Sequence, residues 1–172
     1  MTGEERRARI LSKLQESDTP LSGTALAKLF HVSRQIIVQD IALMRAESNG
    51  ILSTNKGYLL RSNKIETALP KRVFYVKHVT EAVLDEFMTI LDLGGKILDV
   101  AVEHELYGQI NVDLLIETKA DAIDFHNKMM RCANQPLKVL TSDWHYHTVS
   151  APSEKLLDLI EEELRKKGFL PT

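Results

Sequence analysis

The stretch LAKLFHVSRQIIVQDIALMR, which runs from Leu26 to Arg45, decides the fold of the N-terminal part of the chain. A tight turn divides it, and Ser33 is well placed to cap the helix that follows. Apolar residues recur in that helix at three- and four-residue spacing, so they are expected to be buried together: Ile37, Ile41 and Met44. Two helices joined by a short turn, the second with long polar side chains near its start, are typical of a helix-turn-helix.

The sequence on both sides of this stretch predicts a small complete domain. A helix from Glu4 to Gln15 precedes it, and Ser22 can cap the helix over residues 23–30. Two short strands follow with Asn and Gly in the turn between them, a combination typical of a wing: residues 51–54 and 58–60. We therefore predict a winged helix-turn-helix over residues 1–62.

The candidate DNA contacts are polar side chains at the start of the helix that Ser33 caps and at the tip of the wing. Arg34, Gln35 and Gln39 are turned away from the apolar stripe, and Arg can pair with guanine as Gln can with adenine. Ser33 and Lys56 are placed to hold phosphates. These residues predict a DNA-binding face, and a winged helix used for protein contacts is the alternative.

The charges are divided unevenly along the chain. Residues 1–63 hold nine Lys/Arg against six Asp/Glu, a balance of +3, and the net charge of −2 for the whole chain leaves −5 for residues 64–172. A basic head on an acidic remainder suits a DNA-binding domain joined to a sensor domain. With no apolar run long enough to span a membrane and no signal-peptide pattern, a cytoplasmic protein is expected. Cys132 is the only cysteine, which excludes an intramolecular disulfide and a thiolate-rich zinc site, and it is expected to be buried.

A polar stretch over residues 61–70 is the predicted linker to a second domain over residues 71–172. There strand-like and helix-like segments follow in the order β-α-β-β-α-β-α, namely residues 73–79, 81–93, 97–104, 109–116, 120–133, 139–149 and 153–167. Thr80 is expected to cap the first of these helices and Gly94-Gly95 to end it. This order is typical of an α+β fold of the split βαβ type, an α/β sandwich of antiparallel strands covered by helices.

The segment TSDWHYHTV, Thr141 to Val149, carries the densest signal for metal ligands. His145 and His147 stand two apart in a strand-like segment, so their side chains point the same way from Cα atoms about 6.5–7 Å apart. Two imidazoles so placed can converge on one ion. A pair of solvent-facing or hydrogen-bonded histidines on an edge strand is the alternative.

Two further residues complete a candidate metal site. His78 ends the strand before the first helix, and Glu86 lies on that helix with Ala82, Val83 and Ile90 as its neighbours, away from the polar stripe. A carboxylate turned toward an apolar flank is costly unless it is paired, binds a metal or bends back to water. Three imidazoles and one carboxylate suit one divalent transition metal per chain, nickel or zinc first, with iron or manganese as alternatives.

Other side chains have less specific interpretations. His104 shares strand parity with apolar residues, so it is either a core histidine or, with Tyr107, part of an effector pocket. His126 is expected to pack within its helix. Trp144 and Tyr146 point opposite to the two histidines, toward the core or a dimer surface.

Both halves of the chain resemble known families. The first stretch quoted, followed by TNKGYLL at residues 54–60, resembles the N-terminal domain of the biotin repressor. The segments KHVTEAVLDE, VEHELYG and WHYH, at residues 77–86, 102–108 and 144–147, resemble the three-histidine (3H) domain. The whole chain is similar to the niacin-responsive transcription repressors of NAD biosynthesis.

That resemblance implies a homodimer that binds operator DNA of NAD-synthesis and niacin-uptake genes when nicotinic acid is present as corepressor. It also implies a divalent metal at the positions of His78, Glu86, His145 and His147. Two other functions stay open. One is a metal-sensing repressor, in which the ion itself is the signal. The other is a metal-dependent hydrolase, in which a DNA-binding head would have no role.

Overall fold

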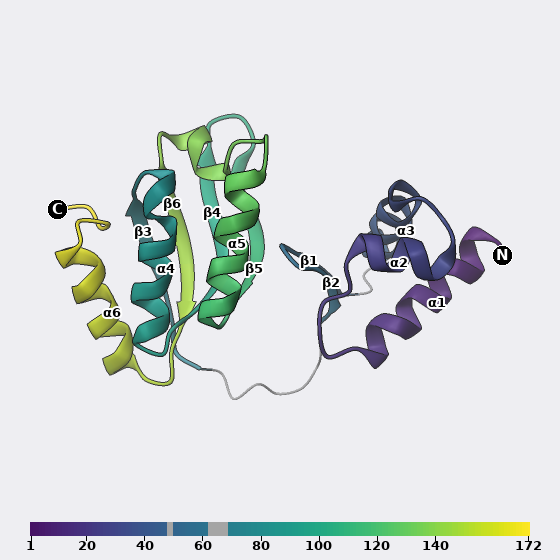
Figure 1. Ribbon diagram of the computed structural model, residues 1–172, viewed down its shortest axis with the longest axis horizontal. Helices are drawn as coiled ribbons and strands as arrows, with labels where there is room; N and C mark the ends of the chain where they lie inside the picture. The colour runs from purple at the N-terminus through teal and green to yellow at the C-terminus, as the bar shows by residue number, and fades with distance from the viewer. Residues whose placement is uncertain (48–49, 62–68) are drawn as a thin grey trace. The chain divides into compact units, whose positions relative to one another are not determined.

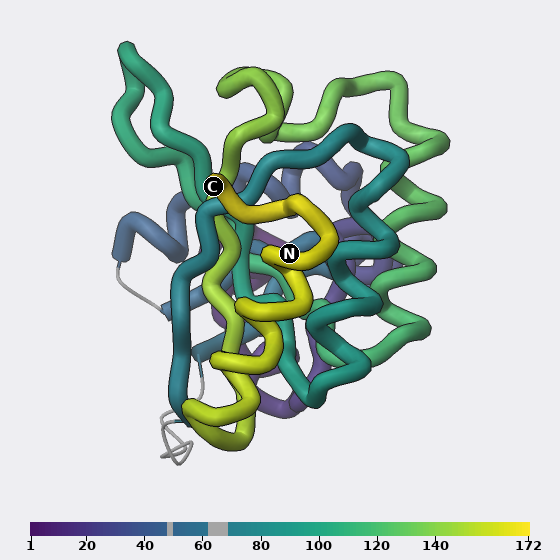
Figure 2. The backbone as a smooth tube through the Cα atoms, turned by 90° about the vertical axis from the view of Figure 1, so that its left-hand side faces the viewer, coloured from purple at the N-terminus to yellow at the C-terminus, as the bar shows by residue number. Residues whose placement is uncertain are grey.

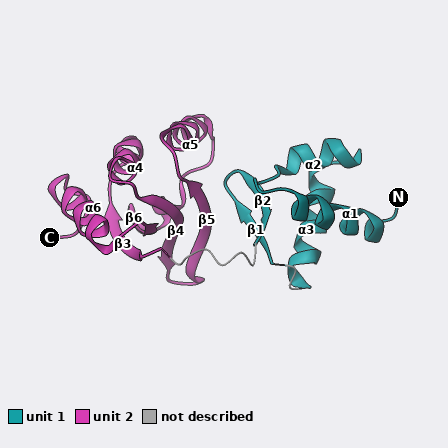
Figure 3. Ribbon diagram, turned by 90° about the horizontal axis from the view of Figure 1, so that it is seen from below, with its two compact units in different colours: residues 1–64 teal, residues 65–172 magenta. Residues whose placement is uncertain are grey.

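The computed structural model describes residues 1–47, 50–61 and 69–172 of the chain. The chain divides into two compact units, residues 1–64 and residues 65–172 (Figure 3). Most of the predicted linker, and the predicted domain boundary at residue 62, lie outside the described residues. No described helix is long and apolar enough to cross a membrane.

The N-terminal unit has three helices followed by a hairpin, as the sequence predicts (Figure 1). Its elements are α1 (Gly3–Glu16), α2 (Gly23–Phe30), α3 (Arg34–Ala46), β1 (Ile51–Thr54) and β2 (Gly57–Leu60). The hydroxyls of Ser22 and Ser33 accept hydrogen bonds from the N–H groups of Ala25 and Ile36, so both predicted caps are formed. The apolar stripes meet in one cluster: Ile10, Leu14, Leu26, Ala27, Phe30, Ile37, Ile41, Met44 and Ile51. The winged helix-turn-helix is confirmed.

The wing is tied to the segment before α2. Leu21 and Tyr58 exchange backbone hydrogen bonds with N···O distances of 2.8 and 2.9 Å. Gly57 precedes this contact at a φ of 137°, and a Cβ on it would lie 2.4 Å from the carbonyl oxygen of Leu21. The hairpin can approach the helices this closely because residue 57 is a glycine.

The C-terminal unit is built on four antiparallel strands in the order β5-β4-β6-β3. They are β3 (Lys71–Lys77), β4 (Lys96–His104), β5 (Gly108–Ile116) and β6 (Trp144–Ser150). Three helices lie on the same side of this sheet (Figures 1 and 3): α4 (Val83–Asp92), α5 (Lys119–Arg131) and α6 (Glu154–Lys166). The predicted α+β fold and its order of elements are confirmed.

The core of this unit lies between the sheet and the helices. Phe74 and Val76 of β3 alternate with exposed neighbours, so they face the apolar stripes of the helices. The helices contribute unequally, because α5 has one buried residue, Ala122, against five in α4 and three in α6. Helix α5 is therefore the most loosely held wall of the core.

The strand predicted over residues 139–149 is shorter than expected and begins only at Trp144. Residues 137–141 form a 3₁₀ helix, and Ser142 and Asp143 follow in the left-handed region with φ of 53° and 71°. A strand cannot pass through left-handed residues, so the extended segment starts after them. The β-rich composition at residues 139–141 was misleading.

Two smaller predictions were also wrong. Thr80 does not cap α4, because residues 80–82 form a 3₁₀ turn and α4 begins at Val83 without a side-chain cap. Cys132 is exposed, since it lies immediately past the end of α5.

Candidate functional site

Glu86 lies on the core-facing side of α4. It belongs to the same buried stripe as Val83, Phe87 and Ile90, and it is 0% exposed. The predicted apolar flank is confirmed, and a stem bent back to water is excluded. A carboxylate this deeply buried needs partners that favour its charge.

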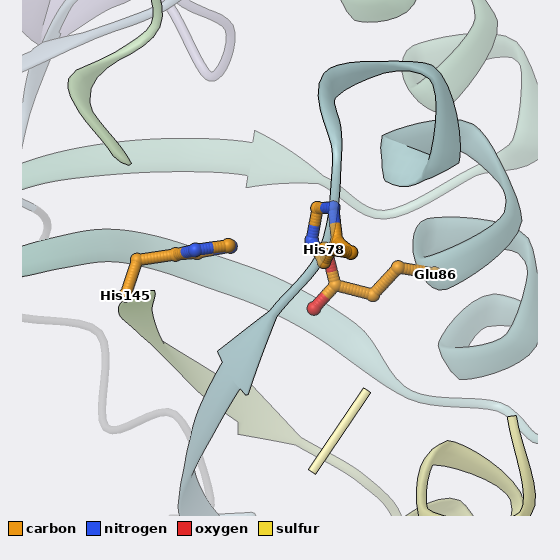
Figure 4. A group of neighbouring side chains, drawn as sticks. All are labelled: His78, Glu86 and His145. Carbon is orange, nitrogen blue, oxygen red and sulfur yellow. The ribbon is translucent and has the colours of Figure 1, made fainter. Parts of the chain in front are cut away.

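Three histidines surround this carboxylate, and they are the three predicted. Nε2 of His78, which follows β3, lies 2.7 Å from Oε2 of Glu86. His145 and His147 of β6 are both buried, with ring centroids 4.9 Å apart, and Nε2 of His147 lies 3.6 Å from the same oxygen. Figure 4 shows His78, Glu86 and His145 pointing into one space, and their ligand atoms lie within 4.8 Å of one another.

Each imidazole is oriented through its other ring nitrogen. The Nδ1 partners are backbone carbonyl oxygens: that of Val79 for His78 (2.9 Å), of Asp143 for His145 (2.8 Å) and of Asp99 for His147 (2.6 Å). A carbonyl oxygen only accepts, so each Nδ1 donates its proton there. This leaves the Nε2 atoms toward Glu86, the arrangement that orients histidines at metal sites.

Opposing effects set the charges of the cluster. Burial alone would raise the pKa of Glu86, but the charge of His147, 3.6 Å away, and the hydrogen bond from His78 hold that pKa well below its ordinary value. Burial, aided by the charge of His147, lowers the pKa of His145 to about 4. Burial would also lower the pKa of His147, but the charge of Glu86 outweighs it and raises that pKa. At neutral pH Glu86 is therefore an anion and His145 a neutral imidazole.

One oxygen of the Glu86 carboxylate has no partner in the part of the chain that the structure describes. Oε1 of Glu86 is buried without a hydrogen bond among the described residues, although buried carboxylate oxygens are normally bonded. Imidazole nitrogens and a carboxylate oxygen are a donor set that divalent transition metals accept. The residues therefore fit a metal: His78, Glu86 and His145 lie close enough together to hold it, and His147, 3.6 Å from the same Glu86 oxygen, is the fourth candidate ligand.

A cavity of about 50 Å³ opens beside the histidines. Its polar border consists of Lys138, His145 and His147, and its apolar walls are Val83, Phe87, Val100, Leu114, Phe125, Met129 and Pro136. Lys138 is buried, and its ammonium donates to the carbonyl oxygen of His78 (2.8 Å) and to the carboxylate of Asp143. No local pattern predicts the burial of Lys138, because a lysine next to apolar residues normally keeps its charge in water.

The predicted effector residues, His104 and Tyr107, lie at the turn of the β4–β5 hairpin, which projects from the rest of the sheet in Figure 2. Their ring centroids are 4.9 Å apart, and Nδ1 of His104 accepts hydrogen bonds from the N–H groups of Leu106 and Tyr107. Neither residue borders the cavity beside the histidines. Their contact with an effector stays a prediction.

Trp144 and Tyr146 lie on the opposite face of β6 and are half-buried. Both stack on Tyr75, with ring centroids 4.6 and 4.5 Å from it. They are not core residues, and their place on a dimer surface stays a prediction. His126 is half-buried, and its Nδ1 has no hydrogen-bond partner among the described residues.

On the head, the predicted DNA contacts lie on an exposed side of α3 and on the wing. Arg34, Gln35 and Gln39 are exposed, and Ser33 stands at the start of α3. Arg34 and the half-exposed Lys56 border one polar hollow of about 230 Å³ between the wing and the start of α2. The structure thus brings a helix residue and a wing residue together, as a DNA-binding face requires.

The burial of Asp40 is not predicted by any local pattern of the sequence. This acid of α3 is 3% exposed, and its oxygens lie 2.6 Å from Nε of Arg6 and 3.4 Å from Nη1 of Arg7. Two of the basic residues counted toward the charge of the head therefore tie α1 to α3.

A winged helix-turn-helix with polar side chains along its exposed third helix defines the chain as a DNA-binding transcription regulator. The family model described as 3H domain matches residues 71–172, and that described as HTH domain matches residues 6–59. The chain is 38% identical to the probable transcription repressor NiaR of Thermotoga maritima over 97% of this chain and 94% of that protein. It is 33% identical to the transcription repressor NadR of Bacillus subtilis over 99% of this chain and 95% of that protein.

The chain therefore belongs to the 3H-domain family of transcription repressors, in which an HTH domain precedes the 3H domain. The resemblance noted from the sequence is confirmed. The hydrolase alternative is not supported, since these relatives are named repressors and the head is a DNA-binding domain.

Proposed function

We propose that this repressor binds operators of NAD-biosynthesis and niacin-uptake genes with nicotinic acid as corepressor, held beside a divalent metal. The observation that carries the proposal is the cluster around Glu86. One oxygen of this buried acid has no partner among the described residues, and oriented imidazoles and an apolar cavity adjoin it. The resemblance to niacin-responsive repressors supports the choice of effector and genes.

The proposed metal site consists of His78, Glu86, His145 and His147, with nickel or zinc as the first candidates and iron or manganese as alternatives. A divalent ion would supply local positive charge and open coordination positions in a unit of net negative charge. His145→Ala should lose most of the bound metal by elemental analysis and still fold, because the unit has its own apolar core. The control is His126→Ala, a histidine of α5 outside the cluster. A full complement of metal in both His145→Ala and His147→Ala would contradict the site.

The proposed DNA-binding residues are Ser33, Arg34, Gln35, Gln39 and Lys56. Two heads of a homodimer would read two half-sites about one helical turn apart or a multiple of it. Arg34→Ala should weaken operator binding by about 1–3 kcal/mol if the guanidinium contacts a base. Arg45→Ala, at the other end of α3, is the matched control, and affinities for operator and random DNA are both measured. An Arg34→Ala protein with unchanged affinity for both would remove Arg34 from the recognition surface.

Nicotinic acid suits the chemistry of the cavity. Its flat ring matches the apolar walls, and its carboxylate and ring nitrogen match a border of lysine, imidazoles and a metal. To act as corepressor, it must bind the DNA-competent arrangement of the dimer more tightly than the other arrangement. Operator DNA must then tighten nicotinate binding by the same factor.

Titration of nicotinate into the metal-loaded protein, with and without operator, tests this proposal. Tighter binding in the presence of operator is expected, and equal dissociation constants would contradict it. Nicotinamide should act more weakly because it carries no negative charge. Tyr107→Ala in the same titration tests the hairpin prediction: weaker binding would support effector contact at His104 and Tyr107, whereas unchanged binding would remove Tyr107 from the effector site.

A metal-sensing repressor is the second candidate, because the His/Glu cluster can hold an ion without any further ligand. The two functions differ in what controls operator affinity. In a metal sensor, operator affinity changes with added metal in the absence of nicotinate. In the proposed corepressor mechanism, operator affinity changes with the nicotinate concentration at a fixed metal concentration.

A further inference from the structure

Lys138 is the one Lys or Arg side chain buried in the part of the chain that the structure describes, with 4% exposure. It belongs to the 3₁₀ helix over residues 137–141 and borders the cavity with His145 and His147. Lysine is rarely enclosed in this way, because its charge is costly to bury unless it is paired.

Two groups pair with the Lys138 ammonium. It donates to the carbonyl oxygen of His78 at 2.8 Å and to the carboxylate of Asp143. An ammonium has three N–H donors, so within the described residues one donor is left for a further acceptor. The side chain of Asp143 is 35% exposed, so this partner can turn to water when another anion approaches Lys138.

The cavity wall opposite α4, which α5 forms, can move to admit an aromatic ring. A volume of about 50 Å³ is smaller than the roughly 150 Å³ of a cavity known to bind benzene. Phe125 and Met129 of α5 line the cavity, and Ala122 is the one buried residue of that helix. Methionine side chains repack readily, so a shift of α5 would make room between these residues and Phe87.

We infer that Lys138 is the residue that selects an anionic ring ligand. The carboxylate of a small aromatic acid takes the place of Asp143 on the Lys138 ammonium, and the ring lies against the apolar walls. This inference rests on the proposed function, which puts nicotinic acid in this unit. An amide of the same shape has no negative charge to exchange for that of Asp143, so it is bound less well.

The exchange also reaches the histidine cluster. The backbone oxygen of Asp143 accepts the Nδ1 proton of His145 at 2.8 Å, and its N–H donates to the carbonyl oxygen of Lys138 at 2.9 Å. Asp143 and Ser142 are both left-handed, a conformation that few non-glycine residues adopt. Release of the Asp143 carboxylate therefore acts on the same turn that orients His145.

The test is isothermal titration of nicotinate and of nicotinamide into the metal-loaded full-length protein. Wild type is expected to bind nicotinate more tightly than nicotinamide. In Lys138→Met the ratio of these two affinities should fall by about 10- to 100-fold, because a charged hydrogen bond contributes about that much. Lys138→Arg keeps the charge and should retain most of the preference. Lys96→Met removes an exposed lysine of β4 and should leave the preference unchanged. Because the readout is a ratio of two affinities, general damage to the cavity does not mimic the result.

The outcomes separate this inference from the corepressor proposal. A Lys138→Met protein with the wild-type preference overturns the role of Lys138 and leaves nicotinate as corepressor. Wild-type protein that does not bind nicotinate overturns the corepressor proposal, and benzoate against benzamide then tests Lys138 alone. No preference for benzoate would overturn the inference as well.

A second variant tests the exchange at Lys138 if Lys138→Met does not fold. Asp143→Asn removes the competing carboxylate, and asparagine tolerates the left-handed backbone. Nicotinate should bind this variant more tightly than wild type. Equal or weaker binding would overturn the exchange at Lys138.

Discussion

Among the described residues, each unit of the chain buries one carboxylate, and the two differ in their partners. Asp40 of the head, 3% exposed, is held by Arg6 at 2.6 Å and Arg7 at 3.4 Å. Glu86 of the C-terminal unit, 0% exposed, is held by His78 at 2.7 Å and His147 at 3.6 Å.

The partners decide what a buried charge can do. A guanidinium group is always charged and does not bind metals, so the ion pair of Asp40 is a permanent tie between α1 and α3. Imidazole can give up its proton to a metal, and Glu86 keeps one oxygen without a partner among the described residues. A buried acid beside arginines is thus a structural tie, whereas a buried acid beside histidines is a candidate ligand.

The largest effect is expected from Glu86→Gln, which removes the anionic ligand and keeps the shape of the side chain. Loss of groups that only support metal ligands costs 10–100-fold in metal affinity, so loss of a ligand should cost at least about 100-fold. Competition with a fluorescent chelator measures the affinity. Glu103→Gln, an exposed glutamate of β4, is the matched control. Equal metal affinity in both variants would show that Glu86 is a structural acid like Asp40.

A smaller effect, on stability and not on metal, is expected from Asp40→Asn. The change leaves Arg6 and Arg7 without their carboxylate. Because both arginines are partly exposed (14% and 27%), water can replace part of the interaction, and the free energy of unfolding of the head should fall by about 1–3 kcal/mol. Urea unfolding followed by far-UV circular dichroism measures the loss. Trp144, the only tryptophan, reports on the C-terminal unit, so its fluorescence transition should not move.

The control for that variant is Asp85→Asn, which breaks an exposed ion pair with Lys167 at 2.6 Å and should cost under about 1 kcal/mol. A loss from Asp40→Asn no larger than this would mean that the buried pair is not a structural tie. Reduced metal content in Asp40→Asn would also contradict the comparison, because Asp40 would then affect metal binding as Glu86 is expected to.

The sequence could predict the features that depend on local pattern. Ser33 and the stripe that includes Ile37 are read from helical spacing, and so is the position of Glu86 on an apolar flank. The two-residue spacing of His145 and His147 similarly predicts that both point to one face of a strand. These signals gave the helix-turn-helix, the order of the C-terminal elements and the four candidate ligands.

The features that the sequence could not give depend on partners far along the chain. Asp40 meets Arg6 across 34 residues, and Lys138 meets the carbonyl oxygen of His78 across 60 residues. No periodicity connects such pairs, so their burial was not predictable. The late start of β6 had no signal either, because Ser142 and Asp143 are left-handed without being glycine.

The smallest expected change is that of the metal affinity over a single pH unit, and it separates the two carboxylates without any mutation. A metal held by this cluster would replace the proton on Nε2 of His147, whose pKa is raised by the charge of Glu86. As the pH falls through that raised pKa, the metal must displace one proton, so its affinity should fall about tenfold per pH unit. His145, with a pKa lowered to about 4, adds no dependence until far more acidic solution. The partners of Asp40 are guanidinium groups and not imidazoles, so the Asp40 ion pair should not follow this change. Metal dissociation constants measured by chelator competition across that range give the slope. A slope of zero would remove His147 from the site, and a slope of two would mean that a second imidazole of the cluster is also protonated.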